Sequence, residues 1–154
     1  MYQCLLGEHV KVPWRSVMCN NRATPKSLFI TWLSLWNRLP TRDGLVTWKD
    51  ITTDCCPLCT NEKESAAHLL FECDYSAAVW NDILHSLRFS RRSAPFDKEL
   101  IWVLKATKRT GDRHKLLLMY FAECIYSIWL QRNEMVFNQK CRSRPSDILL
   151  DINL

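Results

Sequence analysis

The sequence predicts a mainly α-helical, small globular domain that is held together by one structural zinc ion. Three observations support this fold class. Apolar residues recur at helical spacing through most of the chain. Only 3 of the 154 residues are glycine, which leaves little material for tight hairpins. Four Cys and His residues have the spacing of a zinc site, and a hydrophobic content of 47% with 7 Trp is ample for a packed core.

The chain is expected to form one globular unit with three parts. Residues 1–24 form an N-terminal lead-in, residues 25–88 a zinc-binding helical core, and residues 89–154 a C-terminal helical extension. In the lead-in, the alternation from Val10 to Trp14 permits one short N-terminal strand. Because the chain begins close to the zinc-binding core, we expect a fragment or shortened descendant of a larger protein.

The first helix is predicted from Ser27 to Leu39, where Pro40 ends it. Thr41 can then cap a short helix that carries Leu45, Val46 and Trp48. We expect the aromatic residues of the first helix to pack in the core rather than to form a base-stacking platform, because they lie on a continuous apolar stripe. The stripe consists of Leu28, Phe29, Trp32, Leu33, Leu35, Trp36 and Leu39.

The zinc prediction rests on the segment from Cys56 to Cys73. Cys56 and Cys59 are followed by His68 and then by Cys73, in the pattern C-x2-C-x8-H-x4-C. Tetrahedral zinc takes four thiolate or imidazole ligands, and a C-x2-C turn supplies two of them from one tight loop. A C-x2-C pair can also be a redox couple, but the polar residues that follow Cys59 indicate a loop rather than the helix start that such a couple needs. Cys55 is the alternative to Cys56.

A Cys3His set leaves no coordination position for a substrate, so one zinc ion per chain is expected to be structural. Such an ion contributes folding free energy, about 10–16 kcal/mol in zinc-finger peptides. Ser65 is placed to cap a helix that holds His68 in its first turn. On an ideal helix His68 and Cys73 would point about 140° apart. We therefore expect Cys73 past the helix end or on a distorted last turn.

The next two helices are expected over residues 75–87 and 97–106, with a polar and basic loop over residues 88–95 between them. His85 should lie in solvent. The buried face of the first of these helices comprises Val79, Trp80, Ile83, Leu84 and Leu87. The second is expected to bury Leu100, Ile101 and Leu104.

The longest helix is predicted to run from near Asp112 to about Asn138, after a charged connection that is broken at Gly111. Its buried stripe comprises Leu117, Phe121, Cys124, Ile125, Ile128 and Trp129. Its more polar positions are Glu123, Gln131, Arg132 and Glu134. Residues 139–145 form a basic loop, and Ser146 can cap a final short helix. The apolar stretch 116–130 contains Glu123 and is too short to span a bilayer.

The zinc segment resembles the zinc-binding domain that follows the reverse transcriptase in plant non-LTR (LINE-type) retroelements. The resemblance is firm over about residues 25–80 and weaker to about residue 140. Within the zinc segment it rests on Cys56-Pro-Leu-Cys59, Glu64-Ser65, His68-Leu69-Leu70-Phe71, Cys73 and Trp80. Upstream of that segment it rests on Pro25-Lys26-Ser27-Leu28-Phe29, on Trp32 and on the run from Arg38 to Asp43. The weaker downstream match rests on Ile128-Trp129, Arg132-Asn133-Glu134 and Phe137. The resemblance implies a non-catalytic accessory domain of a retroelement protein that helps to hold template RNA or target DNA.

Charge indicates where a nucleic acid could bind. Residues 1–50 carry seven Lys and Arg against three acids, residues 51–100 five against eight, and residues 101–154 nine against five. The zinc segment is the acidic one, and three thiolates on Zn2+ add a further negative charge, which disfavours phosphate binding there. The candidate contacts are Arg91, Arg92, Lys105, Lys108, Arg109, Arg113, Lys115, Lys140, Arg142 and Arg144. A net charge of +5 is also ordinary for a soluble domain of this size.

Three function classes are compatible with the sequence to different degrees. The favoured class is an accessory domain whose partner is RNA or DNA. The alternatives are a protein-interaction module that docks on a reverse transcriptase domain, and a degenerate retroelement fragment without activity. No enzyme is expected, because the chain lacks a Tyr-x-Asp-Asp run, a P-loop and a dinucleotide fingerprint. Neither a membrane nor a small-molecule substrate is expected as partner. Reduced zinc ligands and the absence of a signal segment predict an intracellular, reducing compartment, the nucleus or cytoplasm.

Overall fold

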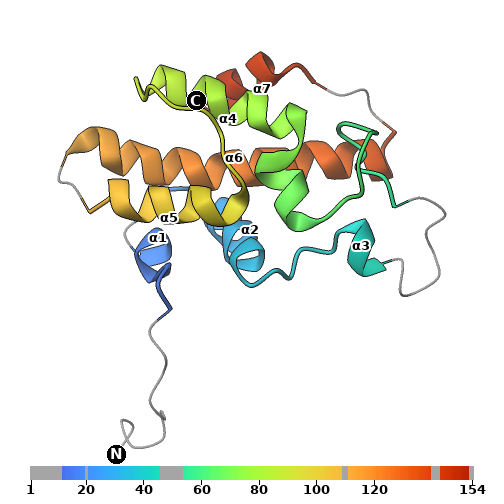
Figure 1. Cartoon of the computed structure of the whole chain (residues 1–154), viewed down its shortest axis with the longest axis horizontal. Helices are drawn as coiled ribbons and strands as arrows, with labels where there is room; N and C mark the ends of the chain where they lie inside the picture. Colours follow the sequence, from blue (N-terminus) through green and yellow to red (C-terminus); the bar gives the residue numbers. More distant parts are fainter. Residues whose placement is uncertain (1–11, 20, 46–53, 109–110, 140–142, 153–154) are drawn as a thin grey trace, which may run out of the picture.

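The computed structural model describes residues 12–19, 21–45, 54–108, 111–139 and 143–152, and these residues are mainly helical (Figure 1). The helices are α1 (Arg15–Cys19), α2 (Pro25–Leu35), α3 (Arg42–Leu45), the π-helical turn η2 (His68–Glu72), α4 (Asp74–Ser86), α5 (Phe96–Ala106), α6 (Asp112–Phe137) and α7 (Pro145–Ile152). The β-structure in the described ranges is one isolated antiparallel bridge between Cys55 and Lys63. The prediction of a mainly helical fold is therefore confirmed.

Val10 and Lys11, the first two residues of the predicted N-terminal strand, lie outside the described residues. The part that is described, Val12 to Trp14, forms a turn that leads into α1, with the Arg15 and Val17 amides donating to the carbonyls of Val12 and Trp14. Val46 and Trp48 also lie outside the described residues. The division into residues 1–24, 25–88 and 89–154 stays a prediction.

Helix α6 is the axis of the fold. It contacts α2 on one side, α4 and α7 on the other, and also touches α5 and η2 (Figure 1). Its expected stripe, from Leu117 to Trp129, is buried as predicted. None of the helices in the described ranges combines the length and the apolar composition needed to cross a membrane.

An aromatic cluster joins this axis to the zinc segment. Phe71 of η2, Trp80 of α4 and Phe121 of α6 meet with ring centroids 5.5–5.7 Å apart, and all three are buried. Aromatic pairs at this separation contribute beyond the area they bury. The core therefore lies directly behind the turn that carries His68.

Helix α2 exposes the aromatic residues that the prediction placed in the core, although Leu33 packs against the core and Leu39 is buried as predicted. Its buried residues are the small polar Ser27, Thr31 and Ser34, whereas Phe29, Trp32 and Trp36 are 57%, 37% and 46% exposed. Small side chains allow α2 to lie close against α6, and they recur at the same helical spacing as the aromatic stripe. The expectation that the aromatic residues form the core was therefore wrong.

Polar contacts fix α2 in this orientation. Thr24 caps the helix by accepting from the Ser27 amide, and Glu123 of α6 accepts from the Thr24 amide at 2.7 Å and from the Ser27 hydroxyl at 2.6 Å. The helix also ends at Leu35, four residues before the predicted end at Leu39, because Trp36 and Asn37 leave the helical path and Asn37 has a positive φ of 49°.

Three further expectations are corrected. In α5, Ile101 is exposed, whereas Glu99 and Val103 are buried. The cause is a hydrogen bond from the indole N–H of Trp80 to the Glu99 carboxylate, which turns the face of α5 that carries Glu99 toward the core. In α6, the supposedly polar Gln131 and Arg132 are buried. Ser146 lies inside α7, and the preceding Arg144 amide is held by the Asp147 carboxylate instead.

The burial of Arg132 has a clear cause, which is an ion pair with Glu64. Glu64 has no exposed surface and Arg132 is 2% exposed. The Arg132 Nε and Nη2 atoms donate to the two Glu64 carboxylate oxygens at 2.7 and 3.0 Å, and the Arg42 amide donates to the same carboxylate at 2.8 Å. Bidentate pairs of this kind combine strength with a fixed geometry. The pair fastens the zinc segment to α6.

We predict that Arg132→Met destabilises the protein by about 3–5 kcal/mol, because it leaves a buried carboxylate without its counter-charge. Adding Glu64→Gln should recover part of this stability. The measurement is urea unfolding followed by circular dichroism, with Arg92→Met, an exposed arginine, as the matched control. Equal stability of Arg132→Met and Arg92→Met would contradict the role given to the ion pair.

Candidate metal centre

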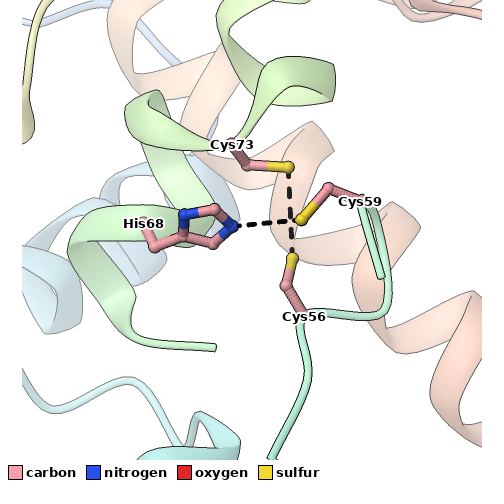
Figure 2. A group of neighbouring side chains, drawn as sticks. All are labelled: Cys56, Cys59, His68 and Cys73. Carbon is pink, nitrogen blue, oxygen red and sulfur yellow. Dashed lines mark hydrogen bonds between the residues drawn. The ribbon is translucent and has the colours of Figure 1, made fainter. Parts of the chain in front are cut away.

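Four side chains converge at one point between the loop after residue 54 and the start of α4. They are Cys56, Cys59, His68 and Cys73, and their ligand atoms all lie within 4.8 Å of one another. Figure 2 shows the three sulfur atoms and the imidazole pointing toward a shared centre. Cys56, His68 and Cys73 are buried and Cys59 is partly buried. The structure thus brings together all four residues that the spacing predicted as ligands.

The first two residues come from a tight turn. The Thr60 amide donates to the Cys56 carbonyl at 2.8 Å, and the Cys56 amide donates to the Glu62 carbonyl at 2.7 Å. Thr60 has a φ of +61°, the left-handed conformation that lets the chain reverse here. Leu58, between the two cysteines, is buried and anchors the turn in the core. Both thiols consequently face the same side.

The other two residues come from the two ends of η2. Ser65 caps this segment, since its hydroxyl accepts from the His68 amide at 3.1 Å, as predicted. The Cys73 amide then donates to the His68 carbonyl at 2.7 Å, which is the i to i+5 bond of a π-helix. Cys73 itself is extended, with φ −66° and ψ 132°. The distorted turn expected from the five-residue separation is confirmed, and it brings the imidazole and the thiol to one side.

The separations fit a tetrahedral zinc ion. With Zn–S about 2.3 Å and Zn–N about 2.0–2.1 Å, two sulfurs of such a site lie about 3.8 Å apart and a sulfur and a nitrogen about 3.6 Å apart. Here Cys56 Sγ lies 4.0 Å from Cys73 Sγ, and Cys59 Sγ lies 3.3 Å from His68 Nε2. Cys3His is also one of the donor sets found in structural zinc sites. The cluster can therefore hold one zinc ion and would use all four protein ligands to do so.

The two buried thiols of the cluster share a hydrogen bond that separates their pKa values. The Cys56 thiol donates to the Cys73 sulfur, which lowers the pKa of Cys73 to about 5 and raises that of Cys56 well above its usual range. Burial opposes the shift at Cys73, and the amides of Tyr75 and Ser76 support it. Those amides open α4, so the start of this helix favours the thiolate.

A carboxylate outside the cluster orients the imidazole. Glu62 Oε2 lies 3.4 Å from His68 Nδ1, which leaves Nε2 facing Cys59. Ligating histidines commonly pair their second ring nitrogen with a carboxylate in this way. The sequence analysis did not predict this contact of Glu62, although it identified the zinc segment as acidic. The signal available in the sequence was a carboxylate six residues before the predicted histidine ligand.

The alternative first ligand, Cys55, lies outside the cluster. Its side chain is exposed, its carbonyl accepts from the Arg42 side chain at 2.7 Å, and it forms the isolated bridge with Lys63. Cys124 is a buried free thiol, as expected, and burial raises its pKa.

The candidate nucleic-acid contacts divide into exposed and engaged residues. Arg92, Lys105, Lys108 and Arg144 are exposed. Arg109, Lys140 and Arg142 lie outside the described residues. Lys115 pairs with Asp112 at 3.3 Å on the surface.

Two of the candidate arginines hold the 88–95 loop in place. Arg91 forms an ion pair with the buried Glu99 and lies 4.0 Å from the centroid of Trp102. Arg113 donates to the Arg88 carbonyl and covers the Phe89 ring at 3.8 Å. These contacts place the loop against the start of α6 and bring the exposed Arg88 and Arg113 together. Arg91 is largely committed to the fold.

The zinc segment also matches a described protein family. A family model described as "zinc-binding in reverse transcriptase" matches residues 1–80, which include all four members of the cluster. These 80 residues are just over half of the 154-residue chain. No curated protein and no solved structure matches the chain.

We predict one zinc ion per purified chain. Single changes of Cys56, Cys59 and Cys73 to Ser, or of His68 to Ala, should abolish stoichiometric zinc and reduce helicity around η2, because each removes one of four ligands. Metal analysis by mass spectrometry and far-ultraviolet circular dichroism measure the two effects. Cys55→Ser is the matched control, since it removes the adjacent thiol and should retain the metal. Zinc retained by the four variants and absent from the control would reassign the ligands.

The shared proton of the thiol pair leads to a pH prediction. Near pH 7 Cys73 is a thiolate and Cys56 a thiol, so zinc binding should release at least one proton from the pair. Below the Cys73 pKa of about 5, both thiols hold protons and zinc should dissociate more readily. Calorimetry in buffers of different ionisation enthalpy counts the protons, and metal retention between pH 4 and 8 gives the profile. Retention that is independent of pH would contradict this assignment.

Proposed function

The chain belongs to the family of zinc-binding domains of reverse transcriptases, and from this membership we propose that it is a non-catalytic accessory domain that helps to hold RNA or DNA. In this proposal the zinc ion is structural. It keeps the 54–73 segment in one conformation and contributes no chemical step.

The observation that carries the proposal is the closed ligand set. Cys56, Cys59, His68 and Cys73 surround one centre with four donors, and a zinc ion held by all four would have no position for water or substrate. Two acids that a catalytic ion could have used, Glu64 and Glu99, are buried against arginines instead. A complete ligand set supports a structural zinc ion, and with it the non-catalytic role proposed for the domain.

Nucleic acid is the proposed partner because of where the charges lie. The acidic zinc segment disfavours phosphates, whereas exposed cations occur on α5, in the loops that flank it and at the start of α6, a region called the α5–α6 end; they are Arg88, Arg92, Lys105, Lys108 and Arg113. Cations of this kind supply the salt-dependent, sequence-independent part of nucleic-acid affinity. We further propose, from the resemblance described for residues 25–80, that the chain derives from a plant LINE-type retroelement and works in a reducing compartment.

A protein-interaction module is the second candidate. It is favoured by large apolar side chains on the surface of α6 and α7, among which Phe137 is 73% and Leu150 67% exposed. Under this alternative the zinc ion again supports the fold, and a reverse transcriptase domain is the partner.

We predict that zinc-loaded protein binds RNA or DNA with a marked salt dependence. The triple change Arg92→Gln, Lys105→Gln and Lys108→Gln should weaken binding across sequences. The slope of log K against log salt should become shallower by about 0.7–0.9 for each phosphate that the variant no longer neutralises. Fluorescence anisotropy at several salt concentrations measures both quantities. The control is Lys98→Gln, an exposed lysine on α5 that is not among the candidate contacts.

Three results would count against this proposal. Unchanged affinity in the triple variant would remove the α5–α6 end as the contact surface. A wild type without affinity for any nucleic acid would favour the interaction module. Metal-dependent polymerase or nuclease turnover that disappears on replacing a carboxylate would overturn the non-catalytic role.

A further inference from the structure

We propose that the exposed aromatic face of α2, extended by the partly buried Trp14, binds unpaired bases of a single-stranded nucleic acid. The inference rests on the proposed function, because it names where and how the strand would be held. The surface is called the aromatic platform and consists of Trp14, Phe29, Trp32 and Trp36. It is distinct from the basic residues at the α5–α6 end that sequence reasoning had selected.

The platform is a continuous stripe. Phe29 and Trp32 lie three residues apart on one face of α2, and Trp36, the residue that caps the C-terminal end of the helix, follows Trp32 by four residues. The Phe29 and Trp32 rings are nearly parallel, with centroids 6.2 Å apart and an angle of 23° between their planes. Trp14, beside α1, extends the stripe by meeting Trp36 edge to face at 5.4 Å.

Within the part of the chain that the structure describes, this face of α2 is turned away from α6. Helix α2 meets α6 through Ser27, Thr31 and Ser34, and Glu123 holds its first turn, so the attachment of α2 does not require the aromatic rings. Phe29, Trp32 and Trp36 remain between one third and three fifths exposed. A contiguous exposed apolar surface is a common mark of an interaction site.

The charged residues in this part of the chain indicate which class of ligand the platform binds. From Val12 to Arg38 the chain contains four Lys or Arg residues and no Asp or Glu. All four are exposed. Lys26 precedes Phe29 by one helical turn, and the Arg38 guanidinium lies 5.9 Å from the Trp36 ring centroid. Glu123, the acid that contacts the start of α2, is bound by Thr24 and Ser27.

Aromatic rings flanked by cations suit a strand that offers bases to the rings and phosphates to the cations. A paired duplex would hide its base faces from the rings. A symmetric dimer through this face would bring the cations of one copy against those of the other. Single-stranded RNA or DNA satisfies both the apolar and the charged groups.

The size of the platform is also suitable. Seven residues separate Phe29 from Trp36, which is about 10 Å along the helix axis. A stacked strand advances about 3.4 Å per nucleotide, so the α2 stripe can accommodate roughly three nucleotides. Stacking on an aromatic side chain is tolerant of sequence, because every base has a π face.

The test measures the anisotropy of fluorescein-labelled 12-nucleotide oligouridine and oligothymidine with the full zinc-loaded chain. Phe29→Ala combined with Trp32→Ala should weaken binding about tenfold or more, since each base stack is worth at least several-fold in affinity. Trp32→Tyr retains an aromatic face and should keep most of the affinity. Phe137→Ala, which removes a more exposed ring on α6, is the matched control and should have no effect.

A second variant and a second readout guard against a fold defect. Arg22→Gln with Lys26→Gln alters two exposed cations and should make the salt dependence shallower while leaving the circular dichroism spectrum unchanged. Ultraviolet crosslinking of a 4-thiouridine strand should place the modified peptide within residues 21–38. Wild-type affinity in the double alanine variant, or crosslinks confined to the α5–α6 end, would overturn the platform and leave the proposed function standing. A wild type that binds no strand would defeat both.

Discussion

The carboxylate of Glu64 has no exposed surface, so all its hydrogen-bond partners must lie inside the protein. This requirement fixes the position of the zinc segment. Glu64 satisfies its two oxygens with Arg132 of α6 and with the Arg42 amide that opens α3. Its own amide donates to the Asp54 carbonyl across the loop. Three parts of the chain that are distant in sequence are thereby joined, and the turn that carries Cys56 and Cys59 acquires a fixed position relative to the core.

The metal cluster and the aromatic core support each other through η2. One side of this turn carries His68 and leads to Cys73, while the other places Phe71 against Trp80 and Phe121. Ligand geometry and core packing therefore cannot change independently. A small domain with a modest core gains a second source of stability in this way, and the family membership of residues 1–80 is consistent with a scaffold of this type.

Sequence reasoning succeeded where a pattern has one physical meaning. The spacing of the Cys and His residues predicted the cluster, and the apolar period predicted α4 and α6 closely. It failed where a partner far along the chain decides the outcome. Arg132 was expected on a polar face because nothing local reveals that Glu64, 68 residues earlier, is buried and requires a counter-charge. The aromatic residues of α2 were expected inside because apolar periodicity does not show that a parallel stripe of Ser and Thr can pack on α6 more closely.

The π turn between His68 and Cys73 also limits how this segment could change in length. Its i to i+5 bond accommodates one residue more than an α-helical turn. Because of this extra residue, one helical segment carries His68 and ends at Cys73, which is also the residue that precedes α4. Removing one residue would leave the two ligands at i and i+4, about 40° apart on a regular helix, so the π turn is a consequence of the five-residue separation. The loop from Thr60 to Lys63 is fixed as well, because the Cys56 amide donates to the Glu62 carbonyl and Cys55 forms its bridge with Lys63. A change of length on either side of His68 should therefore require a new turn geometry before the four side chains could converge again.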